Sequence, residues 1–258
     1  MKNITLSRFI GRDENSTARN ILFVIACLIF PVLVVIGNFV IGARTPITLG
    51  FEDDISLIDP VWRLVQGNQL GIDYHDPRGF GFFYLAALFW RWVGPQYYVL
   101  RAAADTLALV IVCCAFVVAA RQLWRSIFLS LLFCVTVAFE ASAPSVYGFT
   151  QYFGMALAYD RLIMAGLLVL FVQSFARGWD SPEKRDYIGL FAAASLLNTL
   201  FLIKISGPIV GLAIIFSGTA ITRRPISQKV GDISIVLGLF LVMLAADFFI
   251  TGTRIGPL

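Results

Sequence analysis

Residues 21–41 read ILFVIACLIFPVLVVIGNFVI, an apolar stretch of 21 residues without a charged side chain. About 20 such residues are enough for a helix to span the hydrocarbon core of a bilayer. Because backbone polar groups in lipid must bond within their own segment, a run of this kind predicts a helix. Seven more apolar stretches follow, at residues 79–94, 98–120, 126–148, 153–176, 187–203, 205–221 and 233–250. We therefore expect an all-α, polytopic transmembrane helical bundle of seven or eight membrane segments.

The composition points the same way. The chain has 258 residues, of which 59% are hydrophobic and 14% charged, and its mean hydropathy is +0.82. Soluble domains have about 45–50% apolar and about 25% charged residues, so the composition excludes a soluble globular domain. The net charge of +4 does not indicate nucleic acid, since basic residues beside membrane spans act as orientation signals. The four cysteines all lie in apolar stretches without zinc-ligand spacing, which predicts small apolar filler.

The predicted organisation is simple. Residues 1–20 form a basic leader that we expect in the cytoplasm, and residues 21–258 form a single transmembrane domain. The first apolar stretch is longer than a signal-peptide core and lacks a small-residue cleavage site, so we expect it to be retained as a span. The long polar insertion is residues 42–78, which we expect to be an outer loop with short interfacial helices. Chemistry in membrane proteins concentrates where irregular backbone meets a cavity.

The number of basic residues on each side of the membrane distinguishes a topology with eight crossings from one with seven. If all eight stretches cross and the N-terminus is inside, nine Lys and Arg residues are inside and eleven outside, against the positive-inside rule. If residues 79–94, which are short and interrupted by Arg91, do not cross, twelve lie inside and eight outside. We prefer these seven crossings, with 79–94 at the outer interface. The inner residues are then Lys2, Arg8, Arg12, Arg19, Arg121, Arg125, Arg177, Lys184, Arg185, Arg223, Arg224 and Lys229.

Three adjacent carboxylates, Glu52, Asp53 and Asp54, stand near the start of the predicted outer loop. Their mutual repulsion raises at least one pKa, which suits a general base or a cation-binding group. A solvated acidic loop explains the same residues. Both interpretations stay open on sequence alone.

A second polar cluster ends the loop, immediately before the next apolar stretch. His75 is the only histidine, and Asp73 and Asp76 flank it. The three side chains are either metal ligands or hydrogen-bonding groups that fix the loop. Arg78 either binds a phosphate in a bidentate manner or neutralises the aspartates.

Ionisable residues also occur at the ends of later apolar stretches. Asp160 and Arg161 begin one of them, where Asp160 either serves function or complements the helix dipole. Lys204 lies between two stretches with almost no polar linker, and it either reaches to the interface or holds a lipid phosphate. Glu140 has no obvious partner in the sequence. The seven-crossing topology places all four residues on the outer side with the long loop.

This arrangement resembles the GT-C membrane glycosyltransferases, above all the polyprenyl- or dolichyl-phosphate-sugar-dependent enzymes such as protein mannosyltransferases and lipid A aminoarabinose transferases. Their first outer loop opens with acidic residues, continues in an amphipathic helix, and has a glycine some thirteen positions on, as Gly67 follows Asp54 here. The sequence departs from the family at Ile58, where a Tyr is usual, and at Gly79-Phe80-Gly81, where Pro-Pro is usual. Further resemblances, in chain order, are Asp73-Tyr74-His75-Asp76, Phe82-Phe83-Tyr84, Arg101, residues 119–124, Tyr159-Asp160-Arg161 and residues 202–207.

The resemblance implies transfer of a sugar from a polyprenyl-phosphate donor to a glycan, lipid or protein acceptor on the outer face of the bacterial inner membrane, with inversion at the sugar. Asp54 or Asp53 would be the general base, and Lys204, Arg161 and Arg78 would hold the donor phosphate. The acceptor or a divalent metal would be bound by Asp160, Glu52, Asp73, His75 and Asp76. No organic cofactor is implied beyond the lipid-linked sugar.

Two other interpretations compete with this one. A non-enzymatic transporter or flippase component would use Glu140, Asp160 and Lys204 as a charged path through the bundle. Such proteins often contain internal repeats, and none is evident in this sequence. The ending, residues 251–258, resembles an interrupted loop, and the chain is about half the family's usual length, which predicts an N-terminal half or an inactive truncated fragment.

Overall fold

The computed structural model describes residues 14–44, 51–69, 73, 79–96, 98–142, 155–176, 185–222 and 224–251, and the regular elements within these ranges are all helices. The predicted all-α class is therefore confirmed. The elements are α1 (Glu14–Val24), the π-helical η2 (Ile25–Ile29), α2 (Phe30–Arg44), α3 (Phe51–Val65), α4 (Phe80–Val93), α5 (Tyr98–Val118), the π-helical η3 (Ala119–Leu123), α6 (Ile127–Ser142), α7 (Met155–Phe175), α8 (Tyr187–Ile203), α9 (Ser206–Ile221) and α10 (Ile226–Thr251).

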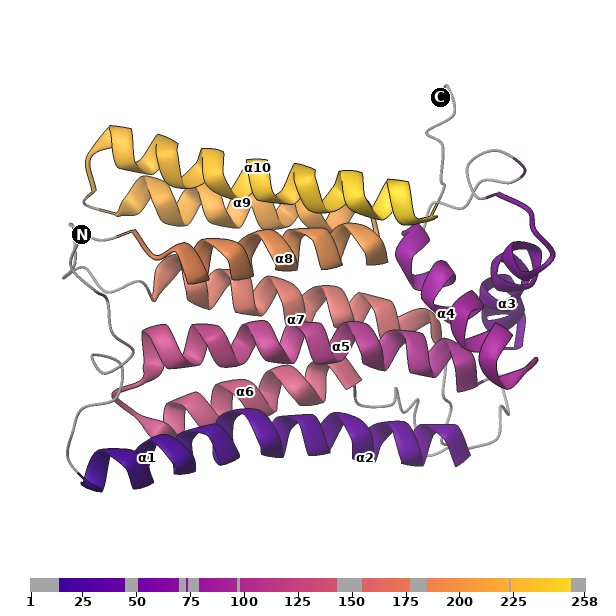
Figure 1. Cartoon of the computed structure of the whole chain (residues 1–258), viewed down its shortest axis with the longest axis horizontal. Helices are drawn as coiled ribbons and strands as arrows, with labels where there is room; N and C mark the ends of the chain where they lie inside the picture. The colour runs from indigo at the N-terminus through magenta and orange to yellow at the C-terminus, as the bar shows by residue number, and fades with distance from the viewer. Residues whose placement is uncertain are drawn as a thin grey trace.

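Most of these helices lie side by side, and α3 and α4 lie together at one end of the bundle (Figure 1). At that end, which we call the α3/α4 end, α2, α6, α8 and α10 finish, and α5, α7 and α9 begin (Figure 1). Helix α4, within the stretch 79–94, has only 14 residues. It lies across the end of the bundle instead of along its length (Figure 1), as the seven-crossing interpretation requires of this segment.

Three helical segments among the described residues are long and apolar enough to cross a membrane: Thr17–Ile41, Tyr98–Leu123 and Ile226–Thr251. They contain 25, 26 and 26 residues, so each is about 38 Å long at 1.5 Å per residue and exceeds a hydrocarbon core of about 30 Å. Shorter apolar helices, among them α6, α8 and α9, complete the bundle. These lengths and compositions are those of a membrane protein.

Helix α5 lies at the centre of the bundle and contacts α2, α4, α6, α7 and α8. Small side chains cover much of its buried surface, including Ala103, Ala104, Ala108 and Ala115. Small residues let helix backbones approach closely, which is how helices pack where lipid removes the hydrophobic drive for association.

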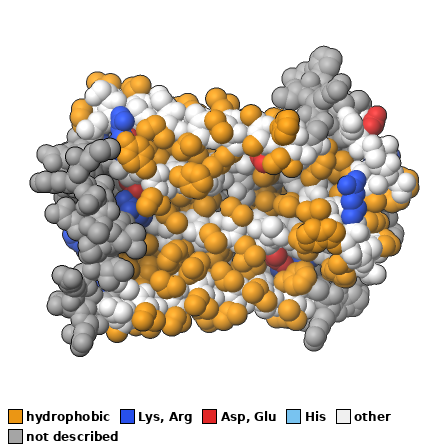
Figure 2. Space-filling model, viewed as in Figure 1, with side chains coloured by type: hydrophobic (Ala, Val, Ile, Leu, Met, Phe, Trp, Pro, Cys, Tyr) orange, Lys and Arg blue, Asp and Glu red, His pale blue; other side chains and the backbone are white. Residues whose placement is uncertain are grey.

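The outer surface of the bundle is apolar. In the 18-residue apolar window of each segment, only 6% of the residues are buried for α10 and 17% for the segment in α1 and α2. Exposed side chains on α10 include Val242, Phe249 and Ile250, and hydrophobic atoms cover most of the described face in Figure 2. Monomeric soluble proteins rarely expose large contiguous apolar patches, so this surface fits contact with lipid.

Several helix boundaries differ from the apolar stretches, and the first helix, for example, begins at Glu14, before the stretch 21–41. Helix α10 begins at Ile226, before the stretch 233–250, because its first turns carry polar residues such as Asp232 that pair at the end of the bundle. The stretch 98–120 continues as helix to Leu123 through η3. Cys27, Cys114 and Cys134 are buried, Cys113 is exposed, and all four are free, in agreement with their interpretation as apolar filler.

Candidate functional site

The α3/α4 end brings together an ion pair from two distant segments. The Lys204 Nζ lies 3.6 Å from the Asp160 Oδ1. Asp160 is in the second turn of α7, and Lys204 has extended backbone between α8 and α9. The two side chains are 40% and 55% exposed, so the pair faces outward and is accessible to a ligand.

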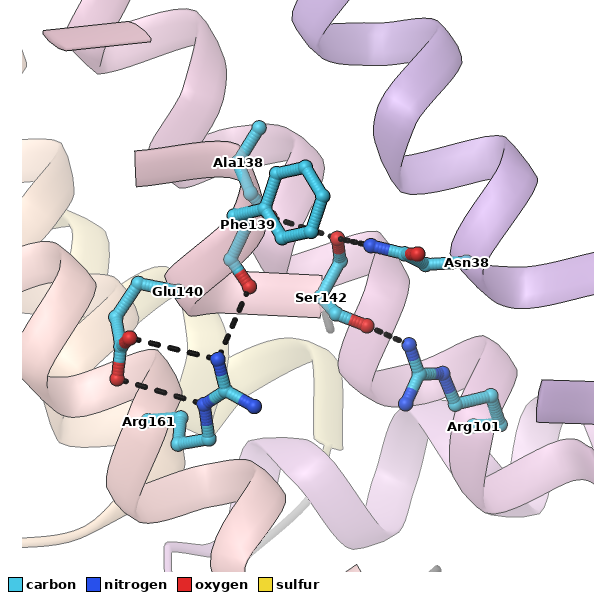
Figure 3. A network of polar contacts seen from close by, with 7 residues as sticks. All are labelled: Asn38, Arg101, Ala138, Phe139, Glu140, Ser142 and Arg161. Atoms are coloured by element: carbon cyan, nitrogen blue, oxygen red, sulfur yellow. Dashed lines mark hydrogen bonds and ion pairs between the residues drawn. The ribbon is translucent and has the colours of Figure 1, made fainter. Parts of the chain in front are cut away.

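A second ion pair lies beside the first in the sequence of α7. Arg161 reaches Glu140 near the end of α6, with 3.4 Å between the Arg161 Nη2 and the Glu140 Oε2. The same Nη2 donates to the carbonyl of Phe139 at 3.3 Å (Figure 3). Glu140, which has no evident partner in the sequence, is thus paired with one of the predicted phosphate-binding cations.

A buried polar network supports these residues from inside the bundle. Arg101 and Asp105 on α5 form an ion pair with 2.8 Å between Nε and Oδ2, and each side chain is only 8% exposed. Arg101 also donates to the carbonyl of Ser142, and the Ser142 hydroxyl accepts from the Asn38 amide at 2.9 Å (Figure 3). This network joins α2, α5 and α6 at the last residue of α6.

The residues that follow the long polar segment, at the start of α4, pack directly on the connection that holds Lys204. The Gly79 backbone N–H donates to the carbonyl of Ile203 at 2.8 Å. A Cβ at Gly79 would overlap the backbone of Leu202 and Ile203, and a Cβ at Gly81 would lie 2.6 Å from the Leu202 side chain. Glycines at these two positions therefore permit the contact, at the place where the resembling family has Pro-Pro.

Helix α3 carries the three adjacent carboxylates in its first turn. The structure describes the backbone of Glu52, Asp53 and Asp54 but not their side chains. Leu57, Val61 and Leu64 are buried at i, i+4 and i+7, a spacing that places one apolar face on the protein. Helix α3 packs on α4 and on α7, and α7 carries Asp160. The acidic segment and the Asp160–Lys204 pair therefore share one end of the bundle.

The second polar cluster is described only in part. Asp73 is exposed, and its Oδ2 accepts from the Gln69 backbone N–H at 2.6 Å, while its own N–H donates to the carbonyl of Gln69 at 2.9 Å. This geometry fixes a turn, in line with the loop-fixing interpretation. His75, Asp76 and Arg78 lie outside the described residues. Within the described part of the chain, no group of three His, Cys, Asp or Glu side chains is placed to hold a metal ion.

A pocket of about 500 Å³ opens at the same end, between α3, α4, α8 and α10. Its lining is mainly apolar but includes two charged residues, Arg91 on α4 and Asp247 on α10. The Asp247 Oδ2 accepts from the Asn198 amide at 2.7 Å. Neither charged residue was predicted as part of a site. The sequence signal that could have indicated them is that each is the single charged residue of its apolar stretch, 79–94 for Arg91 and 233–250 for Asp247.

The opposite end of the bundle holds another set of ion pairs. Arg121 lies 2.6 Å from Asp186, and the buried Asp232 is approached by Arg224 at 3.0 Å and by Arg185 at 3.4 Å. All three arginines belong to the set that the seven-crossing topology assigns to the inner side.

Comparison of the chain with protein-family models, with curated proteins and with solved structures found no significant match.

Proposed function

We propose that this protein is the membrane domain of a GT-C-type inverting glycosyltransferase, or its N-terminal half, that transfers a sugar from a polyprenyl-phosphate donor. The observation that carries the proposal is the Asp160–Lys204 pair at the bundle end where the first turn of α3 contains Glu52, Asp53 and Asp54. In this pair a carboxylate and a cation from segments far apart in the chain meet at the end of the bundle that carries the acidic first turn of α3. This chemistry suits a lipid-linked, phosphorylated substrate.

In the proposed reaction, Asp54 or Asp53 removes the proton of the acceptor hydroxyl, whose oxygen attacks the anomeric carbon of the donor sugar. The bond from that carbon to the phosphate oxygen breaks, and the polyprenyl phosphate leaves. Attack opposite to the leaving group inverts the sugar. A positioned base contributes typically 10²–10⁴-fold to such a step.

Lys204 and Arg161 would stabilise the charge that develops on the leaving phosphate. Each pairs with a carboxylate in the absence of donor, Lys204 with Asp160 at 3.6 Å and Arg161 with Glu140 at 3.4 Å. Both distances are longer than those of tight charge-assisted bonds, about 2.7–2.9 Å. Arg78 is proposed for the same role.

The proposed acceptor- or metal-binding groups are Asp160, Glu52, Asp73, His75 and Asp76. Among these groups, Asp160 lies beside Lys204. When Lys204 binds the donor phosphate in place of Asp160, the Asp160 carboxylate therefore stays near the donor. The proposed location is the bacterial inner membrane, with seven crossings, a cytoplasmic N-terminus and the α3/α4 end on the outer face. Membrane lipids surround the bundle, and the acceptor is a glycan, lipid or protein.

The test is transfer by the purified protein in lipid vesicles, supplied with radiolabelled polyprenyl-phosphate sugars and a membrane extract as acceptor. If Asp54 is the base, Asp54→Asn should abolish transfer, and if Asp53 is the base, Asp53→Asn should do so. Asp59→Asn is the matched control, because Asp59 lies on the same helix, is 48% exposed and pairs with Arg63. Equal transfer by wild type and Asp54→Asn would remove Asp54 from the mechanism. A folded wild-type protein that transfers no sugar would favour the non-enzymatic alternative.

A further inference from the structure

The pocket at the α3/α4 end, which we call the groove, is lined on one side by α4. Its lining includes Phe80, Tyr84, Leu88 and Arg91, which succeed one another at intervals of three or four residues and therefore share one face of α4. Eleven residue steps at 1.5 Å each make this face about 16 Å long. The other walls come from the end of α3, the last turn of α8 and the last turns of α10.

The two charged residues of the groove have opposite signs. Among the described residues, neither Arg91 nor Asp247 forms an ion pair: Arg91 donates to the carbonyl of Leu64 at 3.3 Å, and Asp247 accepts from Asn198. The groove therefore offers one site for an anion and one for a cation. Ionisable residues within apolar membrane helices are costly and mark binding or transport sites.

The hydrogen bond from Asn198 orients the Asp247 carboxylate. It occupies Oδ2, and a carboxylate has about four lone-pair sites, so acceptor capacity remains for a ligand. Asp247 lies one turn before the end of α10, next to Phe248, whose ring stacks on Phe80 at 5.1 Å. Arg91 lies in the last turn of α4, between Trp90 and the 72% exposed Trp92. Tryptophans of this kind concentrate at the level of lipid headgroups.

We propose that this groove binds an aminophospholipid of the bilayer, with the lipid phosphate on Arg91 and the primary ammonium group on Asp247. A guanidinium binds phosphate oxygens through a matched pair of donors, and an ammonium group donates up to three hydrogen bonds to acceptors such as the carboxylate. Leu85, Leu88 and Ile250 provide apolar contact for the first part of an acyl chain. The volume of about 500 Å³ accommodates the headgroup, and the remaining chain lies along the apolar outer surface.

The charge pattern discriminates among bilayer lipids. Phosphatidylcholine has the phosphate and the positive charge, but its quaternary nitrogen has no hydrogen to donate to Asp247. Phosphatidylglycerol has the phosphate but no cation. Phosphatidylethanolamine has both groups, and a hydrogen bond between charged partners contributes enough to make a difference of about tenfold to hundredfold in affinity. This inference concerns lipid binding and does not depend on sugar transfer.

The experiment measures retained lipid by native mass spectrometry after the delipidated protein is mixed with detergent micelles that contain equal amounts of the three lipids, with identical acyl chains. Wild type should retain phosphatidylethanolamine at least about tenfold over the other two lipids. Asp247→Asn keeps the size of the side chain and its contact to Asn198, and it should reduce the preference to near unity. Arg91→Gln should weaken retention of all three lipids.

The matched controls are Asp59→Asn and Arg63→Gln, which remove the same charges from α3 outside the groove and should leave the preference unchanged. Equal retention of the three lipids by wild type would overturn the proposal without any variant. An unchanged preference in folded Asp247→Asn would also overturn it. A last arm adds polyprenyl phosphate as competitor. If polyprenyl phosphate displaces phosphatidylethanolamine from both wild type and Asp247→Asn, the groove belongs to the polyprenyl lipid and the proposal is overturned.

Discussion

The Gly79 backbone N–H donates to the carbonyl of Ile203 across 2.8 Å, which fastens the end of the long polar segment to the connection between α8 and α9. Lys204 is the next residue along the chain, and its side chain reaches Asp160 on α7. One backbone hydrogen bond therefore ties the polar segment, the helix connection and the predicted phosphate-binding lysine into a single unit.

This contact predicts a specific effect of Gly79→Ala. The added methyl group would overlap the backbone of Leu202 and Ile203, which cannot move as a flexible side chain would. We expect the free energy of unfolding to fall by about 1–3 kcal/mol and transfer activity to fall with it. Unfolding in mixed detergent micelles, followed by circular dichroism, measures the change. Gly37→Ala on α2, where a Cβ meets no atom within 4 Å, should be neutral or slightly stabilising.

For the Asp160–Lys204 pair, we expect a substitution to lower activity without lowering stability. Exposed ion pairs contribute about 0–1 kcal/mol, and these side chains are 55% and 40% exposed, so Lys204→Gln should unfold like wild type. If Lys204 stabilises the leaving phosphate, the same variant should lose about 100-fold or more in turnover. Lys229→Gln, at the opposite end of the bundle, is the control. Normal turnover in Lys204→Gln would show that Lys204 does not hold the phosphate and that its side chain only reaches to the membrane interface.

The buried Arg101–Asp105 pair should behave differently from the exposed one. Both side chains are 8% exposed, and removal of one partner leaves an uncompensated charge, which costs about 3–5 kcal/mol. We expect Arg101→Gln to lower the free energy of unfolding by this amount, and the exposed Arg125→Gln to change it by less than about 0.5 kcal/mol. The double variant Arg101→Met with Asp105→Leu should recover part of the loss, because it buries no charge. An Arg101→Gln protein as stable as wild type would show that the buried pair with Asp105 does not stabilise the fold.

The sequence predicts the helical class well, because apolar stretches long enough for a bilayer have no other regular structure available in lipid. The order of the apolar stretches also anticipates that Asp160 and Lys204 lie at one end, because two stretches separate them whether or not residues 79–94 cross. The partner of Glu140 was not predictable, since Arg161 comes from another helix and the contact depends on how α6 and α7 rotate against each other. Arg91 and Asp247 were missed for a similar reason: each is one charge in an apolar stretch, and only the packing of α4 against α10 reveals a shared groove.

The proposed topology makes a prediction that does not depend on enzymology. Asp59 lies on α3 at one end of the bundle and Arg125 at the other, and both are exposed. With the four native cysteines replaced by alanine, Asp59→Cys and Arg125→Cys are each labelled with a membrane-impermeant maleimide in intact cells. Seven crossings place Asp59 outside and Arg125 inside, so Asp59→Cys should react at once and Arg125→Cys only after permeabilisation. If residues 79–94 cross instead, Arg125 moves to the outer side and both variants react in intact cells. That result would separate the Asp160–Lys204 pair from α3 by the bilayer and would refute the proposed site together with the topology.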